Sequence, residues 1–146
     1  MMYEATKEFR FEAGHTLDGH KGKCKNLHGH NYRVLVTLGA PKTNDMDMVK
    51  DFYDIAEFAK EMFDTFDHAF IYNCNCADPF ERELRDVCKR HARKMVELPF
   101  RATAENMAMF FYTLLKSELI NQKADCEIVR VTVYETPTNY AVYEET

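Results

Sequence analysis

Residues 28–38, His28-Gly29-His30-Asn31-Tyr32-Arg33-Val34-Leu35-Val36-Thr37-Leu38, decide how the centre of this chain folds. β-branched and aromatic residues alternate along the stretch, which is typical of an extended strand. Side chains two residues apart on a strand point to the same face. His28 and His30 can therefore reach one metal ion, and Gly29 between them lets another group or backbone come close.

A third imidazole stands at His15, at the end of another stretch with the pattern of a strand. In residues 7–13, apolar side chains alternate with charged ones, as on a half-buried strand. If the two strands pair antiparallel, His15 meets His28 and His30. Three histidines fill three corners of a tetrahedron and leave one open, which is the arrangement of catalytic zinc. A His-x-His pair by itself also occurs as ordinary surface or hydrogen-bonded histidines, so the third histidine matters.

Cys24, four residues before His28, has two possible roles. As a fourth ligand it would close the site and make the zinc structural. As a free thiol beside zinc it would have a lowered pKa and could act as a base or nucleophile. We favour the free thiol. A cupin-type site, which also uses His-x-His on a strand, normally has a glutamate within the next few residues, and residues 31–34 supply none.

Composition limits the class of protein. A chain of 146 residues is long enough for one domain with a real core, and its formal charge of −5 argues against a nucleic-acid surface. The chain has no bilayer-length apolar run and its N-terminal pattern is that of a strand, so we expect a cytoplasmic protein. The five cysteines lack the spacing of a disulfide framework. Cys74-Asn75-Cys76 is a weak metal candidate because no second pair lies nearby.

Hydrophobic periodicity and turn residues predict an α+β order of elements. We expect strands near 3–14 and 29–39, helices over 51–66, 80–92 and 103–121, a short strand over 94–98, and strands over 127–136 and 140–144. The two pairs of longer strands suggest a four-stranded antiparallel sheet with helices on one face. Such a small sheet leaves long edges, and pairing them between subunits would cover them. We therefore expect an oligomer.

Two acidic positions could take part in chemistry. Alternation along the strand near 127–136 puts Glu135 on the side of Val131 and Val133, where it could hold a planar ligand through two N–H donors, or it could already have left the sheet for water. Asp67 followed by His68 at a helix end offers a proton relay, although a histidine there also complements the helix dipole.

These motifs together resemble the family of 6-pyruvoyl-tetrahydropterin synthase and 6-carboxy-5,6,7,8-tetrahydropterin synthase. The matching segments run in the family's order and are Phe11–His15, Gly22–Tyr32, Met48–Phe52, Asp67-His68, Thr103–Asn106 and Val133–Thr136. The resemblance covers nearly the whole chain as one domain, with a longer variable insertion at about 74–100.

The resemblance implies a tunnelling fold (T-fold), in which sheets of several subunits join into a barrel. It implies a homohexamer, a dimer of trimers, with sites at subunit interfaces. It also implies Zn²⁺ held by His15, His28 and His30. The other roles that it implies are Cys24 as catalytic base, Asp67 and His68 as its relay, Glu135 as the catalytic-site pterin anchor, and Thr103 and Glu105 as substrate-binding residues.

The family substrate is the pterin 7,8-dihydroneopterin triphosphate, and two reactions are known from it. Three residues separate Cys24 from His28, as in the bacterial carboxy-tetrahydropterin synthases of queuosine biosynthesis, so we expect that lyase, which releases acetaldehyde and triphosphate. The sequence around residues 134–143 also resembles the pyruvoyl branch, which eliminates triphosphate from the same substrate. A closed Cys-His₃ structural zinc module is the non-enzyme alternative.

Overall fold

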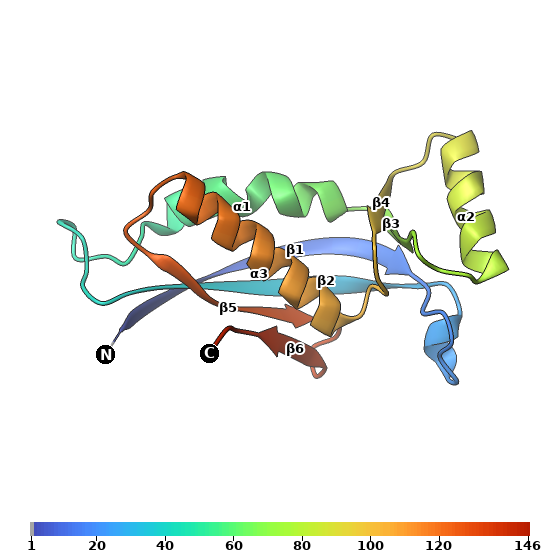
Figure 1. Cartoon of the computed structure of the whole chain (residues 1–146), viewed down its shortest axis with the longest axis horizontal. Coiled ribbons are helices and arrows are strands. Elements are labelled where there is room, and N and C mark those ends of the chain that lie inside the picture. The colour runs from blue at the N-terminus through green and yellow to red at the C-terminus, as the bar shows by residue number, and fades with distance from the viewer. Residues whose placement is uncertain (1) are drawn as a thin grey trace.

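Two long strands, β1 (Tyr3–His15) and β2 (His28–Ala40), form the central antiparallel ribbon of the protein (Figure 1). A computed structural model describes residues 2–146. The ribbon is in register from Tyr3 opposite Ala40 to His15 opposite His28. This pairing confirms the two predicted strands and brings His15 to the other two histidines.

The sheet is larger than the sequence suggested. It has six strands in the order β4-β3-β1-β2-β5-β6, so the expected four-stranded antiparallel sheet is wrong. The additional strands lie beyond β1: β3 (Ala69–Asn73) pairs parallel with β1, and β4 (Met95–Leu98) pairs parallel with β3. On the other side, β5 (Glu127–Tyr134) and β6 (Tyr140–Tyr143) continue the antiparallel pairing from β2.

Strand β3 escaped the sequence analysis because it is short and carries no alternation. Of its five residues, Ala69, Ile71, Tyr72 and Asn73 are buried. A strand covered on both faces reads as a short continuous apolar run, which periodicity cannot distinguish from the end of a helix. The strand expected over 94–98 is present as β4, but only β3 connects it to the rest of the sheet.

Three helices follow the predicted positions closely: α1 (Phe52–Phe66), α2 (Pro79–Arg90) and α3 (Ala104–Asn121). Each begins with a side-chain cap. Asp51 accepts from the backbone N–H of Tyr53 at 2.8 Å, and the Thr103 hydroxyl accepts from that of Asn106 at 3.2 Å. These caps satisfy backbone donors that the first turn leaves without a partner.

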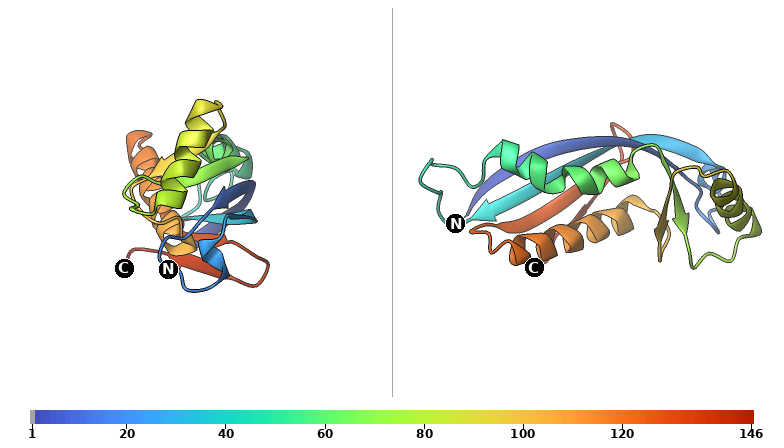
Figure 2. Two further views of the ribbon diagram at one scale, coloured as in Figure 1. Left: turned by 90° about the vertical axis from the view of Figure 1, so that its right-hand side faces the viewer. Right: turned by 90° about the horizontal axis from the view of Figure 1, so that it is seen from above.

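An aromatic cluster joins the two long helices to one face of the sheet. Phe11 of β1 lies 5.7 Å from Phe66 of α1 and 6.1 Å from Phe111 of α3, measured between ring centroids. Both helices therefore cover the same face, as expected, while α2 projects at the end of the sheet beyond β3 (Figure 2). Within residues 2–146, no helix is both long and apolar enough to cross a bilayer.

Candidate metal centre and active site

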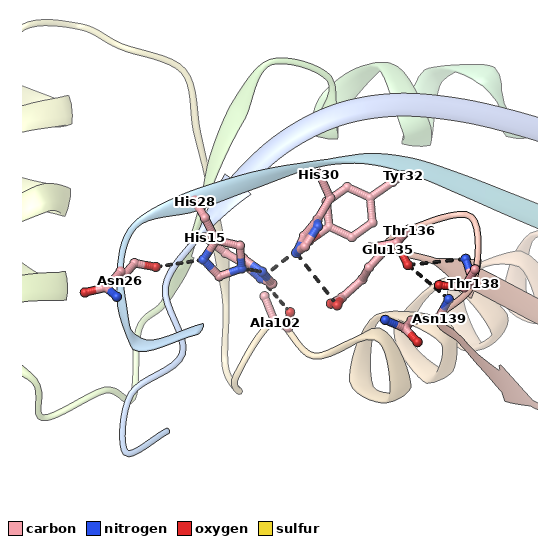
Figure 3. A network of polar contacts seen from close by, with 10 residues as sticks. All are labelled: His15, Asn26, His28, His30, Tyr32, Ala102, Glu135, Thr136, Thr138 and Asn139. Carbon is pink, nitrogen blue, oxygen red and sulfur yellow. Dashed lines mark hydrogen bonds and ion pairs between the residues drawn. The ribbon is translucent and has the colours of Figure 1, made fainter. Parts of the chain in front are cut away.

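Three imidazoles gather at the end of the β1–β2 ribbon, on its core face. The register places His15 opposite His28 and Ala13 opposite His30, and residues opposite each other in an antiparallel pair point to the same face. One nitrogen from each ring lies within 4.8 Å of the others (Figure 3). His15 is fully buried and the other two are half-buried, so the cluster is accessible from one side.

The hydrogen bonds of two rings decide which nitrogen faces the centre. His15 Nδ1 lies 2.9 Å from the carbonyl of Ala102, and His28 Nδ1 lies 2.7 Å from the carbonyl of Asn26. A carbonyl only accepts, so both Nδ1 atoms must carry the proton. The Nε2 lone pairs of His15 and His28 then face each other across 3.0 Å, a repulsive arrangement unless a cation lies between them. Carbonyl-oriented imidazoles of this kind are typical of metal ligands.

His30 completes the donor set. Its Nε2 is buried and has no hydrogen-bond partner among residues 2–146. A buried polar atom without a partner is costly, and a bound cation would satisfy it. Burial, with smaller contributions from His28 and His30, lowers the pKa of His15 to about 4, and burial also lowers the pKa of His30. Neutral imidazole is the form that binds a metal.

Glu135 follows the last residue of β5 and points toward this cluster. Its Oε2 lies 3.7 Å from His30 Nε2, and its side chain is 23% exposed. Burial, and then the charge of Glu105, raise the pKa of the Glu135 carboxyl. Of the two orientations left open by the sequence, the structure has the inward one. This carboxylate therefore lies beside the candidate metal centre, and its one polar contact among residues 2–146 is the one with His30.

Cys24 lies outside the metal cluster. It occupies a short 3₁₀ turn, Lys23–Lys25, in the loop between β1 and β2, and it is partly exposed. Its carbonyl accepts from the backbone N–H of Leu17 at 2.9 Å, which ties the turn to the end of β1. Among the described residues, the potential metal group contains three histidines and no thiol.

Asp67 and His68 form a pair where α1 ends. Asp67 Oδ2 lies 2.9 Å from His68 Nδ1, and its Oδ1 accepts from the backbone N–H of Glu12 at 3.0 Å. That N–H bond and the contact with His68 lower the pKa of Asp67, which keeps the carboxylate charged. A charged Asp67 orients the His68 ring through its Nδ1.

This pair and the three histidines lie on opposite faces of the ribbon. His68 Nε2 is 3.7 Å from the Glu12 carboxylate, and the side chain of Glu12 points away from the buried face that carries Ala13 and His15. An open hollow is lined by Glu12, Asn31, Asp67 and His68, and its lining also includes His30 and Glu135. In one protomer, therefore, the Asp67–His68 pair lies on the Glu12 side of the ribbon, while the His15 side chain points to the other face.

Thr103 and Glu105 belong to the first turn of α3. The Thr103 hydroxyl is used as the helix cap, and Glu105 is exposed at the helix start. Glu105 is near enough to Glu135 for its charge to act on that carboxyl. The amide of Asn106 donates to the carbonyl of Arg101 at 3.0 Å, which fixes the segment that contains Ala102.

Two supporting carbonyls and one aromatic side chain were missed by sequence reasoning. The carbonyls of Asn26 and Ala102 orient the rings, and Tyr32 lies beneath them with its hydroxyl 3.4 Å from His15 Nδ1. Tyr32 could have been suspected, because it lies two residues after His30 on the same face. Ala102 could not, since 87 residues separate it from His15 and a backbone carbonyl leaves no mark in a sequence.

Comparison with protein families and curated sequences gives consistent matches over nearly the whole chain. The family 6-pyruvoyl tetrahydropterin synthase matches residues 4–146. The 6-carboxy-5,6,7,8-tetrahydropterin synthase of Aquifex aeolicus is 37% identical, with 99% of both chains covered. The protein of the same name from Haemophilus influenzae is 36% identical, covering 99% of this chain and all of that one.

Solved structures share the fold. An uncharacterized protein from Wolinella succinogenes superposes with a TM-score of 0.84 at 22% identity, over 100% of this chain and 99% of that chain. The 6-pyruvoyl tetrahydropterin synthase of Plasmodium vivax gives a TM-score of 0.75 at 22% identity, over 99% and 98% of the two chains. At this identity the likeness concerns the fold alone.

Proposed function

Because the chain belongs to the 6-pyruvoyl tetrahydropterin synthase family, we propose that it is a zinc-dependent 6-carboxy-5,6,7,8-tetrahydropterin synthase. It would convert 7,8-dihydroneopterin triphosphate to 6-carboxytetrahydropterin with release of acetaldehyde and triphosphate, in the cytoplasmic pathway to queuosine. The observation that carries this proposal is the 37% identity over 99% of the chain to a curated protein of that name. The spacing of Cys24 and His28 also favours this branch.

His15, His28 and His30 would hold the zinc. The donor set fits, because three imidazoles converge, two have their outer nitrogens fixed by carbonyls, and the third has a buried nitrogen without a partner among residues 2–146. When bound, zinc supplies Lewis-acid stabilisation that lowers the pKa of a coordinated hydroxyl. We expect the open side of the cluster to receive the diol of the substrate side chain.

The remaining residues would bind the pterin and move protons. Glu135 would accept from the 2-amino group and the adjacent ring N–H, because a carboxylate can receive two parallel N–H donors. These donors would satisfy a carboxylate that has few partners in the protein. Cys24 would take a proton from the substrate side chain, and His68, oriented by Asp67, would relay it. Thr103 and Glu105 would line the pterin end of the site.

We further propose that the site is assembled from two subunits. Asp67 and His68 lie on the face opposite to the three histidines, so they would serve the metal centre of a neighbouring chain. On the edge strand β6, the residues Tyr140 and Val142 are 58% and 47% exposed. Exposed apolar residues on an edge strand are expected where the strand pairs with a second copy of the chain. Pairing of such edges would build the barrel, most simply as a hexamer of two trimers.

The test of the activity is incubation of the metal-loaded protein with 7,8-dihydroneopterin triphosphate, followed by mass analysis of the pterin and an assay for acetaldehyde. A 6-carboxy product with acetaldehyde supports the proposal. A pyruvoyl product without acetaldehyde would assign the protein to the second branch. Absence of turnover with one zinc per chain bound would reject both activities.

The non-enzyme alternative is a closed structural zinc module in which Cys24 joins the three histidines. Its discriminating property is the bond from sulfur to metal. A cobalt-substituted sample with a strong thiolate-to-metal absorption band would support the closed module. A spectrum of nitrogen and oxygen ligands alone would support the open site.

A further inference from the structure

A second hollow, of about 610 Å³, lies on the outer face of the sheet where β1, β2 and β3 meet the end of α2. Its lining includes Gly29, His30 and His68, and it continues into Arg93 and Lys94, between α2 and β4. Gly14 and Gly29 pair with each other across β1 and β2, so part of its floor is bare backbone. This hollow thus connects His68 with the basic segment Arg93-Lys94, to which the proposed mechanism assigns no role.

The position of Arg93 relative to His68 is fixed by the sheet. Phe70 of β3 pairs with Met95 of β4, and the Phe70 N–H donates to the Lys94 carbonyl at 3.1 Å. His68 directly precedes β3 and Arg93 lies two residues before β4, so both lie at the same end of this parallel pair. The end of α2 is fixed as well, since Ala92 has a φ of 52° and the Arg93 N–H donates to the Cys88 carbonyl at 2.8 Å. Backbone bonds therefore fix the segment that carries Arg93 at the end of the strand pair where His68 also lies, and both residues line the hollow.

The charges of this segment are not cancelled. Arg85 and Arg101 pair with Asp86 and Asp18, whereas Arg93 is exposed and pairs with no carboxylate of residues 2–146. Lys94 Nζ donates to the carbonyls of Asp64 and Asp67 at 2.7 and 2.5 Å and forms no ion pair with a carboxylate of residues 2–146, although its charge helps to lower the pKa of Asp67.

The surroundings favour an anion. The one carboxylate among the residues lining the hollow is that of Glu12, whose Oε2 faces His68 Nε2 at 3.7 Å. The whole chain has a formal charge of −5, so a local excess of cations here runs against the average. An unpaired guanidinium on a fixed backbone is well suited to phosphate oxygens, which it can bind through two parallel N–H bonds.

We infer that Arg93, supported by the charge of Lys94, binds the triphosphate of the substrate. The inference rests on the proposed function, because it takes the substrate to be a pterin triphosphate. In that molecule the phosphate is attached to the carbon next to the diol. A phosphate subsite must therefore lie near the residues that handle the protons of the diol, and Arg93 lines the same hollow as His68. The subsite would act in the same neighbouring site as Asp67 and His68.

The test compares Arg93→Gln with Arg90→Gln. Arg90 ends the same helix, is exposed, and does not line the hollow, so it is a matched control. Loss of a charge-assisted hydrogen bond to phosphate should raise the KM for 7,8-dihydroneopterin triphosphate about tenfold or more, with little change in kcat. Inhibition by inorganic tripolyphosphate should weaken by a similar factor, and Arg93→Lys should recover part of the loss. Arg90→Gln should change neither constant.

Unchanged KM and unchanged tripolyphosphate inhibition in Arg93→Gln, with an intact melting temperature, would overturn the inference. Calorimetric titration of tripolyphosphate separates this result from failure of the proposed function. If the wild-type protein turns over no pterin yet binds tripolyphosphate through Arg93, the activity is wrong and the anion subsite stands. If the wild type binds no tripolyphosphate, the subsite is rejected.

Discussion

The Nε2 atoms of His15 and His28 face each other at 3.0 Å while the Nδ1 atom of each ring faces a backbone carbonyl. Neither carbonyl can donate, so the two inner nitrogens have no proton to share when both rings are neutral. The surrounding structure holds them in this position, with Ala102 on one side and Asn26 on the other. The pair is thus prepared for a cation before any ion is bound.

Removal of one ligand should remove the metal. We expect His28→Gln to lower bound zinc from about one per chain to a small fraction, because two imidazoles cannot hold zinc as three do. A chelator should lower the melting temperature of the wild type by several degrees, because bound metal stabilises the folded state, and should leave His28→Gln nearly unchanged. Elemental analysis and thermal unfolding measure both effects. The control is His91→Gln, at an exposed histidine outside the cluster, which should keep its zinc. Full zinc retention in His28→Gln would contradict the assignment of His28 as a metal ligand.

Replacement of the thiol should separate chemistry from metal binding. Cys24→Ala should reduce kcat about 100- to 10,000-fold, as expected for loss of a general base. Zinc content and melting temperature should stay near those of the wild type, since Cys24 is outside the histidine cluster and partly exposed. Cys74→Ser, at an exposed cysteine, is the control. A Cys24→Ala protein that loses its zinc would instead support the closed structural module.

A site shared between subunits should show complementation. Cys24→Ala and Asp67→Asn should each be nearly inactive as pure oligomers. When the two inactive chains are unfolded together and refolded, some interfaces should combine an intact Cys24 with an intact Asp67 and recover part of the activity. Asp64→Asn, one turn earlier on α1 and exposed, should stay active and serves as the control. No recovery in mixed oligomers of normal size would mean that each site belongs to one chain.

The carboxylate of Glu135 should be needed for pterin binding. Glu135→Gln keeps the shape of the side chain but replaces one acceptor oxygen by an NH₂ group. The variant can therefore accept only one of the two N–H donors of the pterin. Loss of a charge-assisted contact of about 1.5–3 kcal/mol should raise KM or the dissociation constant of a pterin product about 10- to 100-fold. Fluorescence titration with a pterin measures this change without turnover. Glu127→Gln, at the exposed opposite end of β5, should bind normally; equal affinities in both variants would exclude the anchor.

A buried carboxyl in α2 should make stability depend on pH. Glu81 is 1% exposed; its Oε1 accepts from the Asn73 N–H at 2.9 Å, and its Oε2 has no partner among residues 2–146. Burial, with Asp18 and Asp78 nearby, raises the pKa of Glu81 above its usual 4.5. The folded state therefore holds this proton more tightly than the unfolded state. Its contribution to stability is complete below pH 4.5 and declines as pH rises toward the folded pKa.

The matching variant is Glu81→Gln, which cannot ionise. Relative to the wild type, its free energy of unfolding should increase progressively as pH rises above 4.5, as measured by urea unfolding over a pH series. Glu83→Gln lies on the exposed side of the same helix and should show no such trend. A difference between Glu81→Gln and the wild type that is independent of pH would show that the carboxyl titrates normally in the folded protein.

Local rules were sufficient for most of the elements. The alternation in residues 28–38 predicts β2, and the caps at Asp51 and Thr103 predict where α1 and α3 begin, because these signals lie within a few residues of the structure that they cause. The spacing of His28 and His30 likewise determines that both rings share a face. No local signal predicts β3, whose five residues become a strand only because β1 and β4 flank them.

The amino-acid sequence by itself determined the family, the long strands, the helices and the three histidines of the candidate metal centre, since each depends on residue type and short spacing. Tertiary structure decided which groups from distant segments those residues contact. Only the fold brings the Ala102 carbonyl to His15, turns Glu135 toward His30, and puts Asp67 and His68 on the face opposite to the metal centre. These relationships join segments far apart in the chain, where no periodicity or motif links one residue to the other.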